Sequence, residues 1–317
     1  MHIGKITIGT IDDWTPAPGV VTSWHPTSAA MAKARQAPVS TVPVSYMQGQ
    51  HIRGVYEQAA KGLDYSRQII ATCEVPGICD IDAMNHALNS YLRRHDTYRS
   101  WFSYDGSGDI VRHTITDPAD IEFEPVVHGE ITTEDARKHI VDIPSPLEWG
   151  CFSFGIVQSE DHFDFYASID HVHGDAALIG ITMLEAHGMY TSLTTTGQPM
   201  PLPEAGHFDD FCVQERERTA ALTVDSPEVR AWIEFAENNR DGFPEFPLPL
   251  GDPDHASLVR TGGRNPVGRL RFLRTAGVPA RRRLASDLRP GRHTVGADSP
   301  DADRRRGFGH ACRRAGR

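Results

Sequence analysis

The 317-residue sequence lacks any apolar run that approaches the roughly 18 residues needed to cross a bilayer. It also lacks the apolar stretch near the first residue that a signal peptide requires. We therefore expect a cytoplasmic protein, with peripheral attachment to the inner membrane face as a second option. Cysteine is scarce, odd in number and widely spaced, at positions Cys73, Cys79, Cys151, Cys212 and Cys312. This pattern predicts reduced thiols and neither a disulfide framework nor a zinc knuckle.

Residues 258–317 contain no lysine, glutamate, isoleucine or tryptophan, but they contain 16 arginines and only 4 aspartates. Residues 1–257 carry 16 Lys+Arg against 38 Asp+Glu. The basic segment cannot bury enough apolar surface to offset the entropy of ordering, so we expect a largely disordered tail. Two origins are open: a basic arm that contacts phosphates, or a GC-rich gene read out of frame. The lack of lysine favours the frameshift.

The acidic part, residues 1–257, has the apolar content and periodicity of a folded protein. Hydrophobic spacing predicts helices over residues 46–60, 81–95, 132–141 and 178–193, and another that starts at residue 227. Strands are expected within residues 63–75, 109–116, 152–158 and 162–169, and the last two form a hairpin. The proline-rich first forty residues should be irregular, with short strand-like patches such as residues 5–8. This order favours an α/β fold, a two-layer mixed-sheet sandwich. The acidic charge argues against a nucleic acid partner for the folded part.

The segment at residues 168–176 holds the candidate chemistry, because it lies where a predicted strand ends and a predicted helix begins. One interpretation is general base catalysis by His171. An imidazole with its ordinary pKa of about 6.5 suits proton removal from a hydroxyl at neutral pH. Asp175, four residues on, would fix the loop or pair with an arginine elsewhere, so that the ring is correctly oriented.

Two other interpretations of the same segment stay open from the residues alone. His171, His173 and Asp175 match the start of the His-x-His-x-Asp-His pattern of metallo-β-lactamase-like zinc hydrolases, but Ala176 stands where that pattern has its next histidine. Alternatively, Asp175 is an ordinary helix N-cap and the histidines have no catalytic role.

Several longer runs carry a resemblance to a known family. They are VPVSYMQGQH at 42–51, KGLDYSR at 61–67, LRRHDTYRSWF at 92–102, DPADI at 117–121, WGCFSFG at 149–155 and the segment around His171. Over residues 5–254 the sequence resembles the condensation-domain and chloramphenicol-acetyltransferase-like superfamily. More narrowly, it is similar to the mycobacterial polyketide-associated acyltransferases that esterify trehalose. The likeness stops close to where the charge reverses, which supports the frameshift interpretation.

The resemblance implies a fold, an activity and site residues. The family pattern is His-His-x-x-x-Asp-Gly, so His171 is implied as the general base and Asp175 as a structural carboxylate. Asp170 replaces the first histidine and Ala176 the glycine, as the trehalose-ester branch tolerates. Asp170 and His173 receive no role and are taken as loop or rim residues. The implied reaction is acyl transfer, without cofactor or metal, from acyl-CoA or a polyketide-synthase-bound thioester to trehalose or acyltrehalose. Contact with a polyketide synthase is a further option.

The same resemblance implies the domain organisation. Residues 1–215 would be an N-terminal half-domain, residues 216–257 a helical segment leading to a second half that this sequence lacks, and residues 258–317 the Arg-rich tail. Family members resemble two similar halves with a tunnel to the catalytic histidine between them. We therefore expect an acyltransferase that is impaired by truncation. A non-catalytic remnant or scaffold is the alternative, and a zinc hydrolase is a third.

Overall fold

The computed structural model describes residues 7–62, 67–239 and 271–274. Their strands are β1 (Thr7–Thr10), β2 (Gly19–Pro26), β3 (Gln68–Pro76), β4 (Ser100–Ser103), β5 (Val111–Thr114), β6 (Phe123–Ile131), β7 (Phe152–Gln158), β8 (His162–Asp170) and β9 (Arg271–Arg274). Their α-helices are α1 (Ser28–Arg35), α2 (Tyr46–Ala60), α3 (Ile81–Arg94), α4 (Thr133–Val141), α5 (Ala176–Thr196), α6 (Phe208–Ala220) and α7 (Pro227–Asn238).

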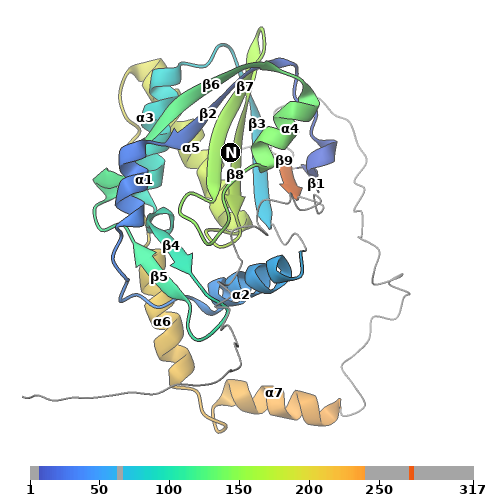
Figure 1. Cartoon of the computed structure of the whole chain (residues 1–317), viewed down its shortest axis with the longest axis vertical. Helices are drawn as coiled ribbons and strands as arrows, with labels where there is room; N and C mark the ends of the chain where they lie inside the picture. Colours follow the sequence, from blue (N-terminus) through green and yellow to red (C-terminus); the bar gives the residue numbers. More distant parts are fainter. Residues whose placement is uncertain (1–6, 63–66, 240–270, 275–317) are drawn as a thin grey trace, which may run out of the picture.

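Seven of the described strands form one mixed sheet in the order β1-β9-β3-β8-β7-β2-β6 (Figure 1). Only the pair β1·β9 is parallel among these strands, and the other neighbours are antiparallel. β7 and β8 are the predicted hairpin and occupy the middle of the sheet. β4 and β5 pair separately beside α2, and α7 lies apart from the body of the protein.

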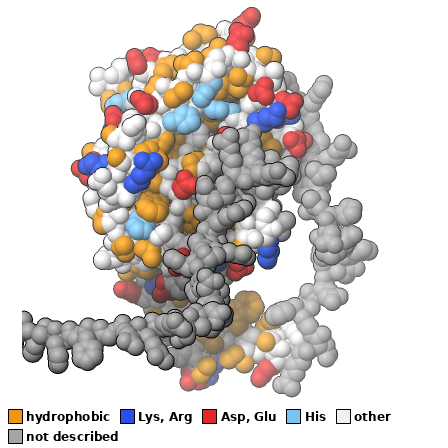
Figure 2. Space-filling model, viewed as in Figure 1, with side chains coloured by type: hydrophobic (Ala, Val, Ile, Leu, Met, Phe, Trp, Pro, Cys, Tyr) orange, Lys and Arg blue, Asp and Glu red, His pale blue; other side chains and the backbone are white. Residues whose placement is uncertain are grey.

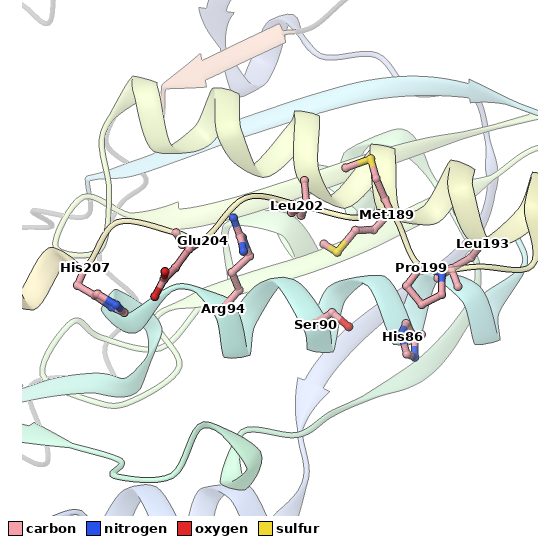
Figure 3. A pocket seen from close by; sticks show the side chains of 11 residues that line it. His86, Ser90, Arg94, Met189, Leu193, Pro199, Leu202, Glu204 and His207 are labelled. Carbon is pink, nitrogen blue, oxygen red and sulfur yellow. The ribbon is translucent and has the colours of Figure 1, made fainter.

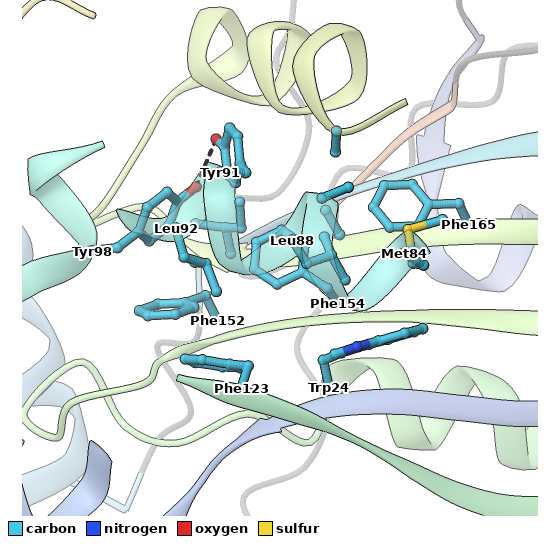
Figure 4. Close-up of a cluster of buried hydrophobic side chains, with 14 of the residues drawn as sticks. Trp24, Met84, Leu88, Tyr91, Leu92, Tyr98, Phe123, Phe152, Phe154 and Phe165 are labelled. Carbon is cyan, nitrogen blue, oxygen red and sulfur yellow. Dashed lines mark hydrogen bonds between the residues drawn. The ribbon is translucent and has the colours of Figure 1, made fainter. Parts of the chain in front are cut away.

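The sheet is covered on both faces, by different helices. α3 and α5 pack over one face, where Trp24, Phe154 and Phe165 are buried among helix residues such as Leu88 and Tyr91 (Figure 4). α4 covers the opposite face with a smaller cluster of residues: Val21, Ile70, Ala136, Ile140, Val157 and Tyr166. Because β8 is buried on both sides, it is a rigid support for the residues that follow its last position.

Most predicted elements are confirmed, and their caps explain why. Ser45, Asp80 and Thr132 each accept a backbone N–H at the start of α2, α3 and α4, as N-cap residues do. Side chains alternate between the two faces in β8, since Phe163 and Phe165 face the larger cluster and Tyr166 faces the smaller one. The α/β mixed-sheet sandwich is therefore correct.

The expectation of largely irregular structure in the first forty residues is wrong, although the expected strand-like patch at residues 5–8 overlaps β1. They contain β2, which pairs with both β6 and β7, and α1, which begins at the N-cap Thr27. β2 escaped prediction because it is buried on both faces with polar residues inside. Thr22 and Ser23 are only 4% and 0% exposed, so the strand shows no apolar–polar alternation.

The Arg-rich tail is described only at Arg271–Arg274. These residues form β9, which pairs with β1 and β3. The backbone groups on the outer side of β3 would otherwise lack strand partners, and such an edge recruits another strand. The rest of residues 258–317 lies outside the described residues. Among the described residues, no helix is both long and apolar enough to cross a membrane.

Candidate active site

His171 is the first residue after β8, at the start of a short loop that leads into α5. Its backbone N–H donates to the Arg67 carbonyl at 2.9 Å, and its exposed side chain turns back over the loop. The ring Nδ1 lies 3.1 Å from the Gly174 carbonyl oxygen. A carbonyl only accepts hydrogen bonds, so Nδ1 carries the proton. In the neutral ring the lone pair is then on Nε2, the arrangement that a proton acceptor needs.

Asp175 ends the same loop and caps α5. Its Oδ1 accepts the backbone N–H groups of Ala177 at 2.9 Å and Leu178 at 3.0 Å. The sequence left three roles open for this carboxylate, namely fixing the loop, pairing with an arginine and capping the helix, and these two contacts are those of an N-cap. The loop is tight, because a Cβ added to Gly174 would lie 2.5 Å from the Leu178 side chain. Asp175 therefore fixes the start of α5, and its effect on the orientation of the His171 ring stays a prediction.

We expect Asp175→Ala to lower the free energy of unfolding by about 1 kcal/mol, the usual cost of losing an N-cap carboxylate. Asp175→Asn keeps an acceptor oxygen at the same place and should stay close to wild type. Urea unfolding of both variants measures the difference. Equal losses in the two variants would contradict a capping role for Asp175.

Asp170, the last residue of β8, is a support of the loop that sequence reasoning missed. Its Oδ1 accepts two hydrogen bonds, from His51 Nε2 of α2 at 2.7 Å and from the Val172 backbone N–H at 2.8 Å. The side chains of Asp170 and His51 are 4% and 9% exposed. Asp170, which stands where the family pattern has its first histidine, thus connects the loop to α2. The assignment of Asp170 to the rim is wrong.

Two further side chains hold the loop from neighbouring elements. Gln48 of α2 donates from Nε2 to the Val172 carbonyl at 2.9 Å, while the Thr97 hydroxyl donates to the His173 carbonyl at 3.0 Å. His173 is 4% exposed and packs against Phe152, so it is a core residue and not a rim residue. Together these contacts hold the loop from two sides.

His173 gives the protein a testable pH dependence. Burial, the largest cause, lowers the pKa of His173 to about 4, against about 6.5 in an unfolded chain. Between these values the unfolded chain binds the proton and the folded chain does not. The contribution of His173 to the unfolding free energy is therefore complete above about pH 6.5 and is lost as the pH falls toward 4.

We expect the titration of His173 to lower the free energy of unfolding by about 3 kcal/mol when the pH falls from about 7 to about 4.5. Urea unfolding at the two pH values measures the loss. His173→Gln should show a smaller drop than wild type, whatever its stability at neutral pH. Identical drops in the two proteins would mean that His173 does not carry this pH dependence.

The structure does not bring His171, His173 and Asp175 together as metal ligands. Nδ1 of His171 donates to a carbonyl, the His173 ring is in the core, and Asp175 caps a helix. Within the described part of the chain, the His, Cys, Asp or Glu side chains that lie close enough to share a metal ion form another group, which includes none of these three residues. The geometry of the loop therefore lends no support to a zinc hydrolase.

A surface pocket of about 470 Å³ lies beside α3 and α5, away from the loop. Figure 3 shows Arg94 and Ser90 of α3, Met189 of α5 and Glu204 of the following segment around it. Neither His171 nor Asp175 lines this pocket. Near it, Glu185 accepts from Arg94 at 3.2 Å and from His95 at 2.8 Å, which ties the two helices together.

Comparison with known proteins places these features in a family. A model of the condensation domain matches residues 40–226, a stretch that holds α2, the hairpin, His171 and Asp175. The chain belongs to the condensation domain family. Among solved structures, "PapA2 acyl transferase" is 54% identical and superimposes with a TM-score of 0.73 over 78% of this chain and 54% of that chain. This match confirms the condensation-domain fold.

Two curated relatives are similar over the same part of the chain. "Acyltransferase PapA3" of Mycobacterium tuberculosis is 57% identical over 257 residues, which are 81% of this chain and 54% of the relative. "2'-acyl-2-O-sulfo-trehalose (hydroxy)phthioceranyltransferase PapA1" of Mycobacterium bovis is 57% identical over 263 residues, or 83% of this chain and 51% of the relative. The chain spans about half the length of the curated relatives it matches.

Proposed function

We propose that this condensation-domain chain carries the proton acceptor of an acyltransferase that acylates a trehalose hydroxyl. The observation that carries the proposal is the His171 side chain, which is exposed at the end of a rigid strand with Nδ1 bonded to Gly174. The names of the similar proteins, which are acyltransferases, support the reaction class. We infer a fatty or methyl-branched acyl group from CoA or from a polyketide-synthase thioester as the donor.

In the mechanism that we infer, Nε2 of His171 takes the proton of the trehalose hydroxyl as its oxygen attacks the thioester carbonyl carbon. The tetrahedral intermediate collapses, and the C–S bond breaks. The imidazolium then gives its proton to the departing thiolate, so the products are an ester and a free thiol. Nδ1 stays bonded to the Gly174 carbonyl throughout, which stabilises the imidazolium form. No covalent enzyme intermediate is needed.

The proposal includes a second half of the site outside this sequence. The chain covers 51–54% of the similar proteins, and its later helices expose large apolar side chains. Phe211 of α6 is 51% exposed, and Trp232 and Ile233 of α7 are 69% and 43% exposed. We propose that residues 1–215 form the catalytic half-domain and that residues 216–257 lead to a second half, which would cover these side chains.

A thioester-consumption assay tests the proposed activity. The purified chain is incubated with a long-chain acyl-CoA, with and without trehalose, and free thiol and acyltrehalose are measured. Thiol release that depends on trehalose, with matching ester formation, supports acyl transfer. Release that does not depend on trehalose indicates hydrolysis and contradicts the proposal. No release from a folded chain favours the alternative, a non-catalytic remnant or scaffold of the family.

A further inference from the structure

Three histidines from three separate elements converge on the face of the sheet that α4 covers. They are His25 of β2, His128 of β6 and His139 of α4, and one ring nitrogen of each lies within 4.8 Å of the others. Histidine side chains gather at the surface beside β6 and α4 in Figure 2. His128 is exposed and the other two are half-buried, so the cluster opens to solvent.

Local structure explains how the three rings come together. Ser23 and His25 are two residues apart on β2 and therefore point to the same face. The register between β2 and β6 passes from Gly129 to Val127, so His128 is the extra residue of a bulge, and bulges re-aim side chains. Ala136, His139 and Ile140 share one side of α4, and the two apolar residues pack on the sheet.

Ring nitrogens of the histidines also lie close together. The Ser23 hydroxyl lies 2.6 Å from His25 Nε2 and 2.7 Å from His128 Nε2. The rings of His128 and His139 have centroids 4.3 Å apart. The Ser23 hydroxyl thus holds the Nε2 atoms of His25 and His128 at one place, and the His139 ring packs against His128 there.

We propose that His25, His128 and His139 bind one divalent transition-metal cation, for which Zn²⁺ is the best match. Three neutral imidazoles are a common donor set for zinc, with water as a fourth ligand. A tetrahedral ion with Zn–N bonds of about 2.0–2.1 Å separates its nitrogens by about 3.3 Å. The nitrogens all lie within 4.8 Å of one another, so they have to approach by at most about 1.5 Å to reach that spacing.

The bound ion would have a structural role. Its ligands lie on β2, on the edge strand β6 and on α4, so it would cross-link the edge of the sheet to the helix that covers it. All three ligands lie within this chain, so binding requires no second half. The site also lies outside the loop of His171, and the proposal therefore does not depend on the proposed acyl transfer.

Zinc binding by the full chain tests the proposal. The chelator-treated protein is dialysed against Zn²⁺, bound metal is quantified, and thermal unfolding is recorded with and without Zn²⁺. We expect one Zn²⁺ per chain and a rise in Tm of about 5–10 °C at 100-fold excess over Kd. His128→Ala changes an exposed residue and should weaken binding at least about tenfold. His139→Gln, which replaces a second ligand, should do the same.

Two control variants locate the metal. His162→Ala removes a histidine at the other end of β8, and His171→Ala removes the candidate base. Both should still bind one Zn²⁺ and gain the same Tm. The proposal is overturned if wild type binds no zinc, if His128→Ala binds zinc as tightly as wild type, or if binding disappears in His171→Ala.

Discussion

Replacing His171 by alanine is expected to lower kcat for acyl transfer by about 10²–10⁴-fold, the usual contribution of a positioned general base. Without the imidazole, no group at the end of β8 accepts the proton of the attacking hydroxyl. The side chain is exposed, so the free energy of unfolding should change by no more than about 0.5 kcal/mol. Trehalose-dependent thiol release and urea unfolding measure the two effects.

His162→Ala is the matched control for this prediction. It removes an imidazole at the first position of β8, whereas His171 follows the last. The control should keep the rate of wild type. A rate in His171→Ala that equals the rate of wild type would remove His171 from the mechanism. A loss of folding in His171→Ala would contradict its placement at the surface.

Asp170→Ala is expected to lower the free energy of unfolding by about 2–4 kcal/mol, because it removes a buried, doubly hydrogen-bonded carboxylate. His51 Nε2 and the Val172 N–H both lose their acceptor in a site that is almost closed to water. The loop that carries His171 should loosen at the same time. We therefore expect kcat to fall as well, although Asp170 does not contact the proposed substrate.

Asp170→Asn and Asp161→Ala control for charge and for position. Asparagine keeps an oxygen that accepts from Val172 and His51, so its loss of stability should be smaller than that of alanine. Asp161 is an exposed aspartate in the hairpin turn, and its replacement should leave unfolding close to wild type. If Asp170→Ala unfolded like wild type, the contact between β8 and α2 would not support the loop.

The elements predicted from the sequence are those with local signals. α2, α3 and α4 each begin at a residue whose side chain caps them, and such caps are visible in any sequence window. β6 was missed because Pro125 and Gly129 read as breakers, while the structure uses them in an edge strand with a bulge. Strands of this kind depend on their partners in the sheet, which a sequence window does not contain.

In the candidate site, too, local features could be predicted from the sequence and long-range contacts could not. The position of His171 and Asp175 between a strand and a helix could be predicted because one loop of five residues holds both, whereas their roles stay predictions. The support from His51 to Asp170 joins residues that are 119 positions apart, so spacing carries no signal of it. The histidine cluster was missed for the same reason, because β2, β6 and α4 meet only in the folded chain. Long-range contacts of this kind are set by topology.

The protonation of the His171 ring tests the central claim most directly, because it requires neither donor, acceptor nor second half. Long-range ¹⁵N–¹H correlation spectra of the histidine-labelled chain at neutral pH report which ring nitrogen carries hydrogen, and His171→Ala identifies the signal. We predict a protonated Nδ1, bonded to the Gly174 carbonyl, and an unprotonated Nε2. A neutral ring protonated on Nε2 would contradict the account, because that nitrogen could not accept a hydroxyl proton.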